Sequence, residues 1–202
     1  MKKLYVNIEE IKIKGRPSLL SKPIRDIDER MQQLASVTEM VKGVFYKFSG
    51  SNQGIQYKKA CDAVTKLSDE LYDASEILND VQTQVVKYEN KIHRYEGETF
   101  SAAAPRKHAV KKMSVNANTA QVEFHKEQMV YLIAIIDKYI VSCVDEVKKL
   151  RYNKENVGKV WYDRQFKDFS IYIDEVCGII FNGCKELDEY KNYLTDKVKM
   201  MA

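Results

Sequence analysis

Apolar residues recur at intervals of three and four along residues 55–95, and this regular stripe is the strongest pattern in the chain. Its members are uncharged in every heptad: Tyr57, Ala60, Val64, Leu67, Leu71, Ala74, Leu78, Val81, Val85, Tyr88, Ile92 and Tyr95. Only a helical period keeps such positions on one side of the chain, so the stripe predicts one long amphipathic helix. At 1.5 Å per residue this helix is about 60 Å long. Because so narrow a stripe does not stabilise so long a helix alone, we expect other helices to pack around it.

A shorter amphipathic helix is predicted before this long one. Its apolar face consists of Leu20, Ile24, Ile27, Met31, Leu34, Val37 and Val41. Ser18 or Ser21 can cap its first turn, and Lys42-Gly43 marks its expected end. Residues 44–54 then combine aromatic side chains with glycines, so we expect an apolar turn between the two helices.

Two more helices are predicted in the second half of the chain. The third begins near Asn118 and has the broadest apolar face, so we expect it to contact two neighbours and to lie at the centre of the bundle. A turn is expected at residues 153–158, and the fourth helix starts around residues 160–162. Its stripe remains in phase across Gly183, which predicts a continuous helix with a close approach to another helix at that glycine. The fold class predicted is all-α: an elongated antiparallel four-helix bundle made of two long helical hairpins.

The chain divides into three parts. Residues 1–96 hold an N-terminal segment and the first hairpin, residues 97–116 form a mobile linker, and residues 117–202 form the second hairpin. Within residues 1–17, a capping box at Asn7 and Glu10 suits a short helix, while alternation over residues 11–14 suits an extended arm, and the sequence leaves both open. The linker contains small residues, a proline and a few basic residues without periodicity, which we interpret as a solvated connection.

Composition and charge narrow the choice of partners. The 202 residues carry 33 Lys and Arg against 29 Asp and Glu, and the resulting net charge of +4 is spread along the helices. This balance does not indicate nucleic-acid binding. No apolar run reaches the roughly 20 residues that a membrane-spanning helix needs, and the first residues do not resemble a secretory signal peptide. We therefore expect a cytoplasmic protein, or one exported without a cleaved signal peptide.

An enzymatic role is not expected, and neither is a cofactor. Di-iron bundles need Glu-x-x-His twice, and the residues three positions before His93, His108 and His125 are not glutamates. Asp69, Asp73, Glu76 and Asp80 share one helix face, but that face points away from the apolar stripe, so we interpret it as solvated. The cysteines Cys61, Cys143, Cys177 and Cys184 lack metal-site spacing and are interpreted as buried free thiols.

The turns of the two hairpins carry a family resemblance. Phe48-Ser49-Gly50 stands where the WXG family of type VII secretion proteins has Trp-x-Gly between two antiparallel helices. Trp161-Tyr162-Asp163 occupies the matching turn of the second hairpin, with Asp163 in place of glycine. The chain thus resembles two WXG-like hairpins in tandem, or an LXG-type targeting module.

What the resemblance implies is a protein-binding role, with a toxin-like cargo or another small helical protein as the partner. A homodimer is a further arrangement that the sequence leaves open. The residues expected to bind the partner are Phe45, Tyr46, Phe48 and Gly50. Trp161 is expected to be mainly structural, because Val157, Val160 and Phe166 offer it an apolar environment. The alternative is a structural coiled-coil scaffold or assembly protein unrelated to secretion.

Overall fold

The computed structural model describes residues 19–52, 54–95, 97, 125–161 and 164–201. It contains four helices: α1 (Ser21–Phe48), α2 (Ile55–Tyr95), α3 (Lys126–Val160) and α4 (Arg164–Met200). No strand occurs among the described residues. The prediction of an all-α fold with a long second helix is confirmed.

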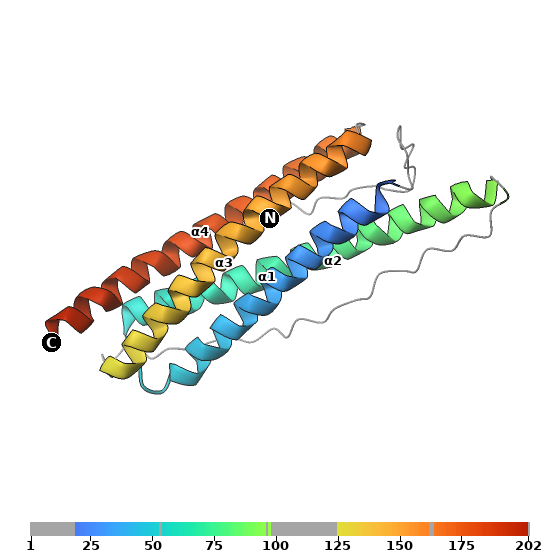
Figure 1. Ribbon diagram of the computed structural model, residues 1–202. Coiled ribbons are helices and arrows are strands. Elements are labelled where there is room, and N and C mark those ends of the chain that lie inside the picture. The colour runs from blue at the N-terminus through green and yellow to red at the C-terminus, as the bar shows by residue number, and fades with distance from the viewer. Residues whose placement is uncertain (1–18, 53, 96, 98–124, 162–163, 202) are drawn as a thin grey trace.

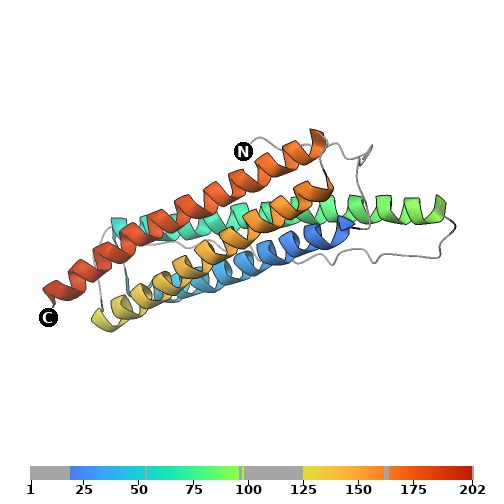
Figure 2. The same ribbon diagram turned by 45° about the horizontal axis from the view of Figure 1, so that its top comes forward.

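The helices form an elongated bundle of two hairpins (Figures 1 and 2). Helix α1 packs against α2, and α3 against α4, while α1 also lies along α3 and α2 along α4. Each of these neighbours is antiparallel to the other, as cross-helix contacts show for α1 and α3. Arg30 approaches Glu146 at 3.6 Å, and Thr38 shares a 2.7 Å hydrogen bond with Tyr139 further along both helices.

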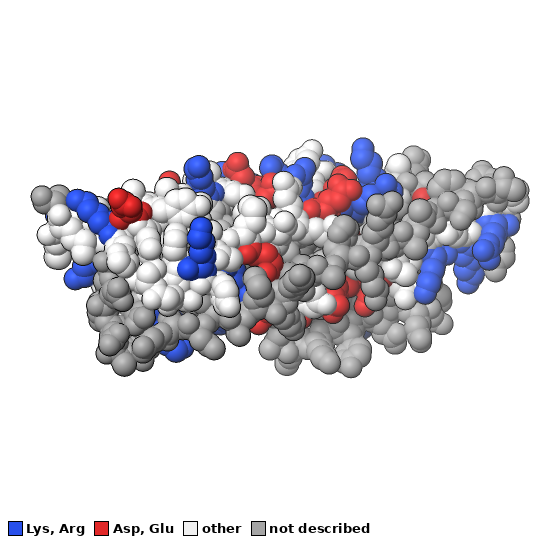
Figure 3. Space-filling view, turned by 90° about the horizontal axis from the view of Figure 1, so that it is seen from below, with Lys and Arg blue, Asp and Glu red and all other residues white. Residues whose placement is uncertain are grey.

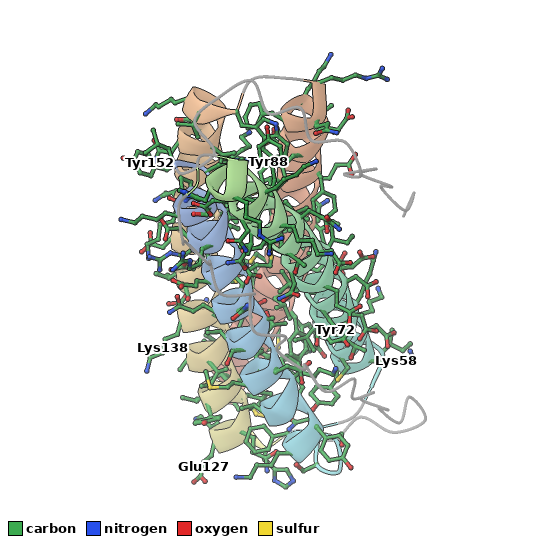
Figure 4. The ribbon with its side chains drawn as sticks, turned by 90° about the vertical axis from the view of Figure 1, so that its right-hand side faces the viewer. Lys58, Tyr72, Tyr88, Glu127, Lys138 and Tyr152 are labelled. Carbon is green, nitrogen blue, oxygen red and sulfur yellow. The ribbon has the colours of Figure 1, made fainter. Side chains whose placement is uncertain are left out.

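The end of α2 and the start of α3 lie toward opposite ends of the bundle. Lys58 near the start of α2 and Glu127 near the start of α3 lie toward one end, and Tyr88 and Tyr152 toward the other (Figure 4). Buried residues of all four helices belong to one hydrophobic cluster, so the two hairpins share one core.

That core is built from the predicted stripes. The stripe of α2 is buried from Tyr57 to Val85, and the inner faces of the other three helices close over it. Helix α4 is continuous through Gly183, and a Cβ placed there would lie 2.8 Å from Cδ2 of Leu67 on α2. The missing side chain thus lets α4 approach α2 closely, as predicted.

Two predicted helix ends are wrong. Helix α1 does not stop at Lys42-Gly43 but runs to Phe48, because Phe45 continues the apolar spacing and is buried against α2 and α4. Helix α3 runs through the expected turn at 153–158 to Val160, because Val157 is a core residue. In both cases tertiary burial of the next apolar residue extends the helix beyond a local break signal.

The predicted central position of α3 is also wrong. Each of the four helices contacts two neighbours, so α3 has no more partners than the rest. Its outer surface also carries exposed apolar residues, among them Val130, Val141 and Val144. The start expected near Asn118 and the linker at 97–116 fall largely outside the described residues.

Candidate functional site

A shallow apolar groove lies between the last turns of α1 and the beginning of α3. It has a volume of about 500 Å³ and is lined by Met40, Gly43, Val44, Lys47, Phe48 and Tyr131. Met40 is 64% exposed and Tyr131 49%, which is unusual for large apolar side chains lying together. Uncharged side chains predominate at this end of the molecule, toward the left in Figure 3.

Packing below the groove positions its wall on α1. Phe45 is fully buried, with its ring 5.7 Å from that of Tyr57 on α2 and 6.1 Å from that of Tyr190 on α4. The hydroxyl group of Tyr57 donates a hydrogen bond to the carbonyl oxygen of Phe45. Burial raises the pKa of Tyr57 and of Tyr190 well above the ordinary tyrosine value, so both rings remain neutral. These contacts hold the end of α1 in one orientation and leave Phe48 at the groove.

The opposite wall is held by the turn after α1. The ring of Phe48 meets that of Tyr131 edge-on, with centroids 5.8 Å apart. Gln128 accepts hydrogen bonds from the side chains of Ser51 and Asn52, each 2.7 Å long. Asn52 is buried, and these two hydrogen bonds join the turn after α1 to the first turn of α3.

The chemistry of the groove suits binding better than catalysis. Lys47 and the phenol of Tyr131 are its ionisable lining groups among the described residues. Neither a carboxylate nor a histidine lines it among these residues, and these are the groups that most often act in general acid–base catalysis. An apolar floor with one cation at its edge matches a surface that recognises apolar side chains of another protein.

The four residues expected to bind a partner fall in different places. Phe45 belongs to the core and has no exposed surface, so its predicted role in partner binding is wrong. Phe48 is half-buried at the last position of α1 and lines the groove. Tyr46 and Gly50 are exposed but do not line it. Sequence reasoning missed Met40, Gln128 and Tyr131.

Trp161 is buried, as its apolar neighbours predicted. Its ring lies 6.1 Å from that of Phe166 and 5.7 Å from that of Phe169, and its backbone N–H donates to the carbonyl oxygen of Val157. Gly158 leaves room for Phe166, whose ring would lie 2.7 Å from an added Cβ. Trp161 therefore closes the end of the second hairpin. Asp163, the other member of that motif, lies outside the described residues.

A second groove is more highly charged. It has a volume of about 380 Å³ and lies between α2 and α4 over Ala60 and Ala63, with Lys59, Asp62 and Lys66 on the α2 side and Glu186 and Glu189 on the α4 side. The described residues contain no group of three or more His, Cys, Asp or Glu arranged for a metal ion. All four cysteines are buried free thiols. None of the described helices is long and apolar enough to cross a membrane.

Comparisons of the chain with protein-family models, with curated proteins and with solved structures found no match.

Proposed function

We propose that this chain is a non-enzymatic helical interaction protein that binds an amphipathic helix of a protein partner in the groove between α1 and α3. The observation that carries the proposal is the cluster of Met40, Val44, Phe48 and Tyr131, which two helices present together at a groove with Lys47 as its one charged lining residue among those described. Exposed apolar patches of this kind are typical of interaction sites, and a helix that inserts apolar residues every three or four positions fits a groove between two helices.

Lys47, the one cation among the described residues that line the groove, is expected to orient the partner helix. Lys47 is exposed at the edge of the groove, where an acidic side chain of the partner would meet it. A rim charge of this kind contributes mainly to association rate and register, while the buried aromatic and methionine contacts supply most of the affinity. The expected partner helix is therefore apolar on one face and acidic along one edge.

The more specific proposal comes from the turn motifs. Phe48-Ser49-Gly50 ends α1 and Trp161 ends α3, so both motifs stand between the antiparallel helices of a hairpin. This placement favours a WXG-like or LXG-like protein of bacterial type VII secretion, acting as a substrate, targeting partner or escort. The cargo would be a toxin-like protein or another small helical protein.

The groove is tested by a matched pair of substitutions. A photo-crosslinking amino acid at position 40 is expected to capture a protein partner in the producing cells, and the same amino acid at Ile171 on α4 is not. Met40→Asp should abolish recovery of that partner, because a carboxylate would have to be buried in an apolar contact. Ile171→Asp is the control, since both side chains are exposed and both variants should keep the melting temperature of the parent. Equal binding by the two variants would contradict the proposed groove.

Export is tested separately from binding. In a bacterial host with an active type VII system, the tagged chain or its captured partner should appear outside the cell, and deletion of the secretion ATPase should abolish this. Intracellular retention of both proteins in the presence of the ATPase would favour the structural scaffold instead, even if the groove binds a partner.

A further inference from the structure

The outer surface of α3 carries a second regular stripe, in addition to the one that faces the core. Its members alternate at spacings of four and three: Val130, Ala134, Asp137, Val141, Val144, Lys148, Arg151 and Glu155. All of them are exposed. The inner stripe of the same helix, from Met129 to Leu150, is buried. Such alternation is the spacing of a coiled-coil seam, so α3 has a seam inside the bundle and a second one facing solvent.

The middle of the outer stripe is apolar. Val141 is 60% exposed and Val144 40%, and the two lie one turn apart. β-Branched side chains are well suited to the core of a two-helix seam, whereas they contribute little to an isolated surface. None of the other three helices covers these valines.

The charges on either side of the valines are self-complementary in one orientation. If a second copy of α3 lies antiparallel, with the two-fold axis between residues 142 and 143, Val141 faces Val144 of the second copy. Asp137 then faces Lys148 of the second copy, and the two-fold axis repeats both contacts. A parallel arrangement would place Asp137 against Asp137 and Lys148 against Lys148, which like-charge repulsion disfavours.

The charged residues beside the stripe are also complementary in this antiparallel register. Lys138 and Asp145 each lie one position after a stripe residue, and in the antiparallel register they approach each other across the axis. Lys138 points away from the bundle on the outer side of α3 (Figure 4). Ala134 meets Arg151 of the second copy, where a small side chain leaves space for a long one. Near the axis, each pair of facing residues thus joins two apolar side chains, two opposite charges, or a small side chain and a long one.

The ion pairs within one chain are compatible with this arrangement. Asp137 is 3.0 Å from Lys191 of α4, yet its side chain is 63% exposed. Lys148 lies 3.8 Å from Asp145, and its side chain is 72% exposed. The pair of Lys148 and Asp145 is exposed on both sides and contributes little to stability, so Lys148 can reach toward a second copy at small cost. Lys191 is only 20% exposed, but it also pairs with Asp188 at 2.8 Å and keeps that partner when Asp137 turns toward a second copy.

We propose that a second copy of this chain docks antiparallel along the outer stripe of α3. The partner is the chain itself because the stripe residues from Ala134 to Arg151 pair with their own reverse as apolar, opposite-charge or small-with-large contacts. This dimer does not depend on the groove proposed above, since no lining residue of that groove belongs to the stripe. One helix pair gives a modest interface, so we expect a monomer–dimer equilibrium that depends on concentration.

Sedimentation velocity over a range of concentrations tests the apolar contact. The parent chain is expected to shift from monomer to dimer as its concentration rises. Val141→Asp/Val144→Asp should remain monomeric with unchanged circular dichroism, because both side chains are exposed in the monomer. Phe181→Asp, which changes an equally exposed side chain of α4, should dimerise like the parent. A parent chain that is monomeric at all concentrations, or a dimer unaffected by the valine substitutions, would overturn the proposal.

A charge exchange tests the register. Asp137→Lys and Lys148→Asp should each weaken self-association roughly tenfold or more, because each variant places like charges opposite each other twice. A mixture of the two single variants should form a one-to-one dimer, since each mixed pair again joins a cation to a carboxylate. Self-association of the single variants at parental strength, or failure of the mixture to associate, would rule out this register.

Discussion

The ammonium group of Lys42 is fully buried between α1 and α2. It donates hydrogen bonds of 3.3 Å to Glu39 and to Ser68, and Ser68 in turn donates to Glu39. Burying a lysine is costly unless its charge is paired, so this three-residue cluster holds the two helices in one register. The side chain of Glu39 is partly exposed to solvent, whereas that of Lys42 is not. The buried ammonium group of Lys42 therefore needs the carboxylate of Glu39 more than that carboxylate needs the ammonium group.

This difference leads to a prediction about stability. Glu39→Leu leaves the buried ammonium of Lys42 without its carboxylate and should lower the free energy of unfolding by about 3 kcal/mol. Lys42→Met fills the same space without a charge and leaves Glu39 bonded to Ser68, so its cost should stay below about 1 kcal/mol. Urea unfolding of both variants measures the difference. Equal losses of unfolding free energy in the two variants would show that the buried ammonium group of Lys42 does not depend on Glu39.

At the scale of single elements, two glycines of α4 occupy different environments. A Cβ at Gly183 would lie 2.8 Å from the buried side chain of Leu67, whereas a Cβ at Gly178 would meet nothing within 4 Å. Both lie inside the same helix, where alanine is intrinsically favoured over glycine by about 1 kcal/mol. The contact with α2 therefore decides whether alanine at position 183 raises or lowers the free energy of unfolding.

We expect Gly178→Ala to raise the free energy of unfolding by up to about 1 kcal/mol, because only helix propensity changes. Gly183→Ala should lower it by about 1–2 kcal/mol, because Leu67 must shift within a packed core. Thermal and urea unfolding of the two variants provide the comparison. Adding Leu67→Val to Gly183→Ala should recover part of the loss, and a stabilised Gly183→Ala variant would contradict the close approach of α4 to α2.

The continuity of α1 explains how the groove is built. Because α1 extends to Phe48 rather than ending at Gly43, Met40, Val44 and Phe48 lie on successive turns of one helix. A helix that ended earlier would have placed the aromatic cluster in a loop. The groove is therefore a property of two rigid helices, and its geometry should change little when a partner binds.

At the scale of the whole molecule, the core contains several buried phenols. Burial raises the pKa of Tyr57, Tyr139, Tyr172 and Tyr190 above the ordinary tyrosine value of about 10. In the unfolded chain these groups lose their protons near pH 10, whereas in the folded chain they keep them. Their contribution to stability is thus fully present below that pH and is lost as the pH rises above it.

The bundle is therefore expected to unfold in alkali, with helical circular dichroism falling as the buried phenols ionise above about pH 10. Tyr172→Phe is the informative variant, because the hydroxyl group of Tyr172 has no hydrogen-bond partner within the described part of the chain. It should keep its stability at neutral pH and show a shallower decline in alkali. A loss of stability in alkali as steep as that of the parent would show that ionisation of Tyr172 does not contribute to alkaline unfolding.

The packing between the two hairpins also matters at this scale. Each hairpin packs both of its helices against the other hairpin, α1 against α3 and α2 against α4. The contacts between Thr38 and Tyr139, and between Leu67 and Gly183, thus join residues of different halves. The two hairpins share one core, and the outer stripe of α3 and the groove are two separate surfaces on the bundle.

The sequence by itself determined which residues share a helix face. The stripe of α2, the continuity of α4 through Gly183 and the burial of Trp161 follow from spacing and from neighbouring apolar residues, which are local properties. Only the tertiary structure decided which faces meet. Met40 and Tyr131 are far apart in the sequence and form one groove because α1 packs against α3. The helix ends at Phe48 and Val160 and the burial of Phe45 depend on long-range contacts in the same way, since burial against other helices outweighs the local preference of a glycine or a turn.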